Sequence, residues 1–259
     1  MQKPLILVTN DDGIDAPGIS TLVEILSPHA DLIVVAPQNE QSAAGLSITI
    51  RQPLKIHKRN MFGLESYAVS GTPADCVKMA LSVIMKRKPN LIVSGINKGS
   101  NAGRNVLYSG TVSAVIEGCL REVPGVAFSC YDLFDPDYKL AQSHIPSVVR
   151  YVLDNPLPEG TLLNVNFPSK KHGPYKGIKM VRQGKQYWLE DPSQRAHPTD
   201  GEYWWLGAKM SAYEDHLESD THLLEQGWVT AVPVYVAELT HHDTLTQRKS
   251  HFEDYFLKP

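Results

Sequence analysis

The sequence lacks the features of a secreted, membrane-spanning or strongly charged protein. Its three cysteines form no CxxC pair and no even set, which is typical of reduced thiols in the cytosol. No apolar run approaches the ~20 residues that a membrane-spanning helix needs, and no charged leader precedes the first apolar segment. A net charge of -3 over 259 residues gives no field that favours nucleic acid. We therefore expect a cytoplasmic protein with neither a membrane nor a nucleic-acid polymer as partner.

Several common catalytic motifs are also missing. The chain has no GxGxxG after a strand, no GxxxxGK[ST] and no Gly-x-Ser-x-Gly, which argues against a dinucleotide cofactor, a P-loop NTPase and a nucleophile elbow. The histidines do not fall at HExxH spacing. Their one cluster, His241-His242-Asp243, fits a solvated or hinge segment better than a zinc site.

Apolar segments do alternate with amphipathic ones over the first two-thirds of the chain. This alternation predicts an α/β protein with a three-layer α/β/α, Rossmann-like core and a mostly parallel sheet covered on both faces. We expect strands at 5–9, 31–36, 47–50, 54–57, 67–69, 90–94, 126–129 and 161–165. We expect helices at 16–26, 73–85, 109–120 and 137–153, and a long polar loop at 95–107.

The alternation breaks near residue 170, where prolines, glycines and tryptophans replace it. We predict a catalytic core over 1–170, a protruding hairpin or arm over 171–220, and a return strand with a C-terminal oligomerisation tail over 221–259. Exposed aromatics on such an arm suit oligomerisation or the rim of a substrate site. A local cluster packed under a loop explains them about as well.

The segment Asn10-Asp11-Asp12-Gly13 directly follows an apolar run and is the most informative feature of the chain. Two adjacent carboxylates at the end of a buried strand raise each other's pKa and resist joint ionisation. A cation bound between them removes this cost, and such oxygen ligands suit Mg²⁺, Mn²⁺ or Ca²⁺. The alternative is an ordinary surface turn, because Asn, Asp and Gly are common turn residues.

Four further polar segments follow predicted strands, and ligands of parallel sheets bind at the carboxyl ends of strands. Alone, the segments 38–45 and 71–75 are better explained as a connector and a helix cap. The loop 94–103 is unusually rich in glycine, amides and charge for a connector. The segment 108–113 opens a helix with hydroxyls and free N–H groups, which suits a phosphate.

Together these loops predict an oxygen-only site of Asp, Asp, Ser and Asn side chains, in which Mg²⁺ or Mn²⁺ keeps waters and binds a substrate phosphate. The chemistry expected there is metal-assisted hydrolysis of a phosphate ester, with a nearby carboxylate accepting the proton of the attacking water. Spacing does not decide between Asp11 and Asp12 as that acceptor, so both are candidate catalytic residues.

Five segments give the chain a resemblance to the SurE survival-protein family, the metal-dependent 5'/3'-nucleotidases. They occur in the family's order as LVTNDDGIDAPGI (7–19), VVAPQNEQSA (34–43), GTPADCV (71–77), VSGINKG (93–99) and YSGTVSA (108–114). A weaker match, SDTHLLEQGWVTAVPV (219–234), extends the resemblance, whereas 183–218 carries little of it.

The resemblance implies hydrolysis of nucleoside 5'- and 3'-monophosphates, with exopolyphosphatase activity as a further expectation. It implies one divalent metal ion per subunit, Mg²⁺ or Mn²⁺, and a homodimer or homotetramer that exchanges its C-terminal arm. The implied metal ligands are Asp11, Asp12, Ser42 and Asn97. The implied phosphate or substrate contacts are Asn10, Asn101, Ser109, Gly110 and Thr111. Some members carry Arg and Gly where this chain has Gln41 and Ala43, a difference that bears on substrate contacts and avoids the ligands.

Three other protein classes also use acidic residues after a first strand. A metal-dependent deacetylase would place histidines beside the acids, and the first histidine here is His29. A haloacid-dehalogenase phosphatase would need DxD. A receiver module would need a phosphoacceptor Asp at a central strand end, where this chain has Ala36-Pro37 and Ser94-Gly95. The deacetylase-like hydrolase and the receiver-type Mg²⁺-binding module remain the alternatives.

Overall fold

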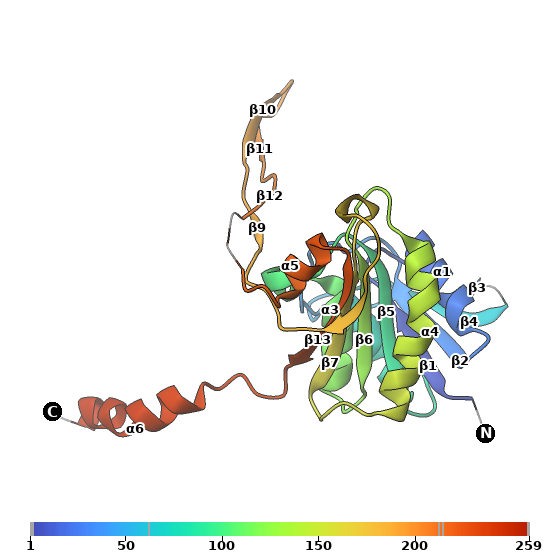
Figure 1. Ribbon diagram of the computed structural model, residues 1–259, viewed down its shortest axis with the longest axis horizontal. Helices are drawn as coiled ribbons and strands as arrows, with labels where there is room; N and C mark the ends of the chain where they lie inside the picture. The colour runs from blue at the N-terminus through green and yellow to red at the C-terminus, as the bar shows by residue number, and fades with distance from the viewer. Residues whose placement is uncertain (1–2, 62, 212, 214, 258–259) are drawn as a thin grey trace.

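The computed structural model describes residues 3–61, 63–211, 213 and 215–257 (Figure 1). Its main element is a nine-stranded sheet in the order β3-β4-β2-β1-β5-β6-β7-β13-β8. Neighbouring strands are parallel except for β3–β4 and β7–β13. The strands are β1 (Leu5–Thr9), β2 (Asp31–Pro37), β3 (Ile56–Met61), β4 (Leu64–Val69), β5 (Leu91–Lys98), β6 (Gly125–Cys130), β7 (Thr161–Phe167), β8 (Gly177–Met180) and β13 (Trp228–Tyr235).

Helices cover both faces of this sheet, which confirms the predicted α/β fold with a mostly parallel sheet. One buried cluster joins the sheet to α1 and α4, and a second joins it to α2 and α3. The helices are α1 (Pro17–Leu26), α2 (Pro73–Met79), α3 (Gly110–Cys119), α4 (Tyr138–Asp154), α5 (Asp220–Glu225) and α6 (His242–Leu257). Shorter turns are η1 (Ala80–Ile84), η2 (Gly103–Leu107) and η3 (Lys170–His172).

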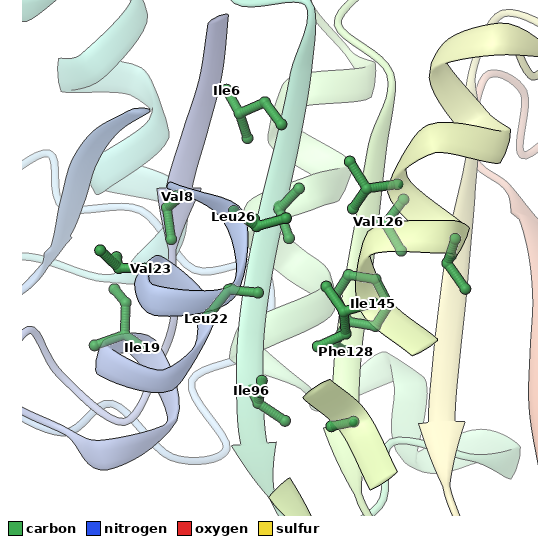
Figure 2. Close-up of a cluster of buried hydrophobic side chains, with 14 of the residues drawn as sticks. Ile6, Val8, Ile19, Leu22, Val23, Leu26, Ile96, Val126, Phe128 and Ile145 are labelled. Carbon is green, nitrogen blue, oxygen red and sulfur yellow. The ribbon is translucent and has the colours of Figure 1, made fainter. Parts of the chain in front are cut away.

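The central strands are apolar throughout because both of their faces are buried. In β1, Ile6 and Val8 join the cluster under α1 and α4, while Leu7 joins the cluster under α2 and α3. Figure 2 shows the first cluster, in which residues of α1 and α4 pack against residues of β1, β5 and β6. This packing fixes the carboxyl ends of β1 and β5 side by side.

Side-chain caps fix the starts of α2 and α3, and the sequence predicts the first of them, at Thr72. Thr72 accepts a hydrogen bond from the backbone N–H of Asp75, whose carboxylate accepts one from the N–H of Thr72 in return. Ser109 caps α3 by accepting from the N–H of Val112 at 3.1 Å. The start of α3 is therefore fixed at Gly110, next to the end of β1.

The chain after β8 leaves the sheet and returns in β13. Two short antiparallel pairs project from the body, β9 (Trp188–Leu189) with β12 (Lys209–Met210) and β10 (Ser193–His197) with β11 (Gly201–Trp205) (Figure 1). Helix α6 extends away from the sheet, and none of its described residues is buried (Figure 1). The division at residues 170 and 220 stays a prediction, and residues 212, 214, 258 and 259 lie outside the described chain.

Two local predictions are wrong. Residues 47–50 form no strand: the N–H of Thr49 bonds to the carboxylate of Asp75, and the hydroxyl of Thr72 bonds to the carbonyl of Ser47. The polar loop predicted from residue 95 begins later, because β5 continues to Lys98 alongside β6. Among the described helices, none is long and apolar enough to cross a membrane.

Candidate functional site

The acidic pair Asp11–Asp12 lies at the carboxyl end of β1, in the middle of the sheet. Strand β2 flanks β1 on one side and β5 flanks it on the other, so the loops after all three strands meet at this edge. The N–H of Gln41 donates to the carbonyl of Asp11 at 2.8 Å, and that of Ile14 donates to the carbonyl of Pro37 at 2.8 Å. These two bonds hold the loop after β2 against the acidic pair.

The side chain of Asp11 points to the start of α3. Its Oδ1 atom accepts a hydrogen bond from the hydroxyl of Thr111 at 2.5 Å. The pKa of Asp11 is raised from 3.8 to about 6, chiefly by burial and in part by the charge of Asp12, although the hydrogen bond from the Thr111 hydroxyl lowers it. A Cβ atom on Gly110 would lie 2.7 Å from the Cβ of Asp11, so only glycine fits there.

The side chain of Asp12 is 5% exposed and has one cationic partner, Lys98, with 3.6 Å between Nζ and Oδ1. Burial raises the pKa of Asp12, the charge of Lys98 opposes that shift, and Glu40 adds to it. The other carboxylate oxygen, Oδ2, is buried without a hydrogen-bond partner among the described residues. The pair therefore carries more negative charge than its protein surroundings compensate.

Further unpartnered polar atoms gather at the same edge. Within the described chain, seven buried side-chain oxygen or nitrogen atoms have no hydrogen-bond partner, and four of them belong to Thr9, Asn10, Asp12 and Ser94. Thr9 and Ser94 are register partners at the ends of β1 and β5. Since buried polar groups are normally paired, this concentration indicates a surface shaped to bind a polar ligand.

Ser42 and Asn97 occupy the loop after β2 and the end of β5. The hydroxyl of Ser42 is exposed and donates to Glu40 at 2.6 Å. The side-chain N–H of Asn97 donates to the carbonyl of Gly99 at 2.8 Å. Both residues lie at or beyond the ends of strands that neighbour β1, each is held by a bond within its own segment, and among the described residues neither side chain bonds to the acidic pair.

Asn101 is buried in a network of polar side chains from β6 and β7. Its side-chain N–H donates to the hydroxyl of Ser129 at 2.6 Å, and its backbone N–H donates to Asn166 at 2.8 Å. The amide of Asn164 donates to the carbonyl of Asn101 at 3.0 Å. This network fixes the loop that joins Asn97 to Ser109.

The sequence matches the model of one protein family. The model of the family described as survival protein SurE matches residues 6–190. This chain belongs to the SurE family.

Curated relatives and a solved structure agree with this membership. The chain is 52% identical over 256 residues to a protein of Protochlamydia amoebophila named 5'-nucleotidase SurE, with 98% of both chains covered. It is 44% identical to the protein of that name from Christiangramia forsetii, covering 93% of this chain and 94% of the relative. The crystal structure of the SurE protein from Aquifex aeolicus superposes with a TM-score of 0.81 at 34% identity, covering 95% of this chain and 99% of that one.

The SurE motifs of this chain come together in the fold, and the structure adds residues that sequence reasoning missed. Among the residues expected at the site, Asp11 contacts Thr111 directly, and Gln41 joins the loop of Ser42 to Asp11. Glu40 and the Ser129–Asn166 network were not expected there. The signal for the network was present, since polar side chains near the ends of otherwise apolar strands are unusual.

Proposed function

We propose that this chain is a metal-dependent 5'-nucleotidase that hydrolyses nucleoside 5'- and 3'-monophosphates to nucleoside and phosphate. The relatives at 52% and 44% identity carry the name 5'-nucleotidase, which supports the activity. The observation that carries the proposal is the buried acidic pair, which meets the start of α3 at Thr111 and holds an unpartnered oxygen of Asp12. The deacetylase-like and receiver-type alternatives have no comparable support.

The residues at this edge fit a hard divalent cation such as Mg²⁺ or Mn²⁺. The oxygens Asp12 Oδ2 and Asn10 Oδ1 are buried without described partners, and Lys98 is the one described cation paired with the two adjacent carboxylates. No group of three His, Cys, Asp or Glu side chains in the described ranges forms a metal cluster, so neutral oxygens would complete the set. We propose Asp11, Asp12, Ser42 and Asn97 as the ligands.

Such a cation would supply a Lewis acid for the phosphoryl oxygens and lower the pKa of a bound water. The side chains and backbone of the protein would position the substrate phosphate and supply charge. Ser109, Gly110 and Thr111 present the N-terminus of α3, which attracts a phosphate. Asn10 and Asn101 supply amides at the same edge. Asp11 and Asp12 are the candidate proton acceptors.

A phosphate-release assay with chelator-treated protein tests this function. The substrates are AMP, GMP, a 3'-nucleotide and polyphosphate, each with and without added Mn²⁺ or Mg²⁺. We expect metal-dependent release of phosphate from the nucleotides. Release from polyphosphate tests the expected exopolyphosphatase activity. Metal-independent release, or release from no nucleotide at all, would contradict the proposal.

We further propose that the protein assembles as a homodimer or homotetramer through exchange of its C-terminal arm. All described residues of α6 are solvent-exposed, including the large apolar side chains Leu245, Phe252, Tyr255, Phe256 and Leu257. A helix with this much exposed apolar surface is typical of an element that packs against another chain.

A further inference from the structure

Lys98 is a cationic residue at the site that the proposed ligand and phosphate contacts leave unused. Its side chain is 34% exposed and its Nζ atom lies 3.6 Å from Oδ1 of Asp12. A charge-assisted N–H···O bond is normally about 2.7–2.9 Å, so this ion pair is loose. Among the described residues, no other Lys, Arg or His lies within 4.0 Å of either acid.

The net charge at this edge depends on which groups are bound there. Asp11 and Asp12 carry two negative charges, and one divalent cation would bring that sum to zero. A phosphate monoester is close to a dianion at neutral pH, so its binding would add negative charge that the neutral metal–carboxylate group does not balance. The remaining positive groups are the start of α3, beside Asp11, and the ammonium of Lys98, beside Asp12.

The side chain of Lys98 is mobile enough to contact Asp12 in one state and a bound phosphate in another. Its ammonium group is a point charge on a flexible four-carbon stem, with no fixed direction of approach. The loose pairing and partial exposure leave that stem free to rotate, whereas Asp12 is 5% exposed and fixed in the loop after β1. A divalent cation and the ammonium would repel each other if both faced Asp12.

We propose that Lys98 competes with the divalent cation for Asp12 and, once displaced, binds the phosphate group of the substrate. This inference rests on the proposed nucleotidase function and assigns a residue to it. Lys98 therefore weakens metal binding in the absence of substrate and strengthens phosphate binding in the presence of metal. The two effects have opposite signs, which separates this role from a purely structural one.

The test measures binding by calorimetry on the full chain. Mn²⁺ is titrated into chelator-treated wild type and Lys98→Met, with Lys98→Gln as a second neutral variant. Lys98→Arg keeps the charge. Lys88→Met is the matched control, because Lys88 pairs with Glu122 at 3.2 Å and precedes β5, away from its carboxyl end. Inorganic phosphate is then titrated into each protein at saturating Mn²⁺.

We expect the neutral variants to bind Mn²⁺ about five- to tenfold more tightly than wild type and phosphate at least about tenfold more weakly. Lys98→Arg and Lys88→Met should match wild type in both titrations. If wild type binds Mn²⁺ but the neutral variants bind it no more tightly, or bind phosphate equally well, the role of Lys98 is overturned. If wild type binds no Mn²⁺, the proposed function fails as well.

Discussion

Gly110 and Asp11 are packed so closely that one methyl group would disturb the site. A Cβ atom at position 110 would lie 2.7 Å from the Cβ of Asp11 and 2.9 Å from its Oδ2. Real atoms do not approach this closely, so either Asp11 or the start of α3 would have to move. Glycine at this position is explained by the close approach of the helix to the acidic pair.

We predict that Gly110→Ala lowers kcat/KM for AMP about 10²-fold while the protein still folds, because Asp11 is displaced. Steady-state kinetics at saturating Mn²⁺ measures this, with circular dichroism to check folding. Ser113→Ala is a matched small change in the same helix, since within the described chain its hydroxyl bonds only to the carbonyl of Ser109. Equal kcat/KM values for Gly110→Ala and wild type would contradict the close packing.

The pKa of Asp11 predicts how stability depends on pH without metal. The folded value of about 6 lies above the ordinary 3.8, so between these values the folded state holds a proton that the unfolded state has lost. The free energy of unfolding therefore falls as pH rises from about 4 to 6, by about 3 kcal/mol. Urea denaturation in EDTA across this range measures the fall.

Two comparisons identify Asp11 as the source of that pH dependence. Asp11→Asn cannot ionise, so its free energy of unfolding should lack the 3 kcal/mol fall. Saturating Mn²⁺ should offset the fall in wild type, because a ligand of the folded state alone stabilises it. If the free energy of unfolding of Asp11→Asn in EDTA still falls with pH as much as that of wild type, another group is responsible.

At the scale of elements, the loop after β5 is held by the root of the projecting hairpins. The buried carboxylate of Asp220, at the start of α5, accepts from the N–H groups of Gly103 at 3.0 Å and Gly184 at 2.6 Å. The N–H of Arg104 donates to the carbonyl of Gln186 at 2.8 Å. The hairpins and the loop that carries Asn101 are therefore joined.

We predict that Asp220→Asn destabilises the protein by about 1.5–3 kcal/mol and raises KM for AMP more than it lowers kcat. An amide has only one acceptor oxygen, so it cannot replace both carboxylate oxygens, and the loop of Asn101 loosens. Asp200→Asn, at an exposed hairpin position near His197, is the control and should change neither value. A normal KM with lost stability would show that Asp220 acts on folding alone.

The sequence predicts the elements well where burial alone decides them. Strands such as Leu5–Thr9 are apolar on both faces, and the cap Thr72 marks the start of a helix. It fails at residues 47–50, where the carboxylate of Asp75 takes the N–H that a strand ladder would use. It also misses α6, because that helix buries no described residue and so lacks a strong apolar periodicity.

The site is predictable only in part, for a similar reason. The acidic pair is visible because charge after a buried strand is unusual, and the family resemblance names its expected partners. The contacts of Lys98 with Asp12 and of Gly103 with Asp220 join residues 86 and 117 positions apart. Such contacts depend on strand order and loop paths, which local patterns do not encode.

At the scale of the whole molecule, the core and the C-terminal helix are separable. The sheet with α1 to α4 has its own buried clusters, and α6 contributes to neither of them. Figure 1 shows α6 joined to β13 by an extended segment and lying apart from the sheet. The exchanged arm, the homodimer or homotetramer and the cytoplasmic location stay predictions.

We predict that deletion of residues 239–259 reduces the assembly to a smaller species but changes the free energy of unfolding of the core by less than about 0.5 kcal/mol. The reason is that α6 makes no buried contact within its own chain. Sedimentation velocity measures the assembly state and urea denaturation, carried out at low protein concentration, measures stability. If the truncated protein keeps the same number of chains per assembly as the full chain, the proposed role of the arm is contradicted.

We propose that Asp11 and Asp12 hold the metal on which nucleotide hydrolysis depends. The most direct test of this proposal is the rate of phosphate release from AMP by chelator-treated protein after Mn²⁺ is restored. Asp11→Asn should fold and lose at least about 10³-fold of this rate, while Asp15→Asn, an exposed carboxylate in the same loop, should keep it. Full Mn²⁺-dependent activity of Asp11→Asn would contradict the account.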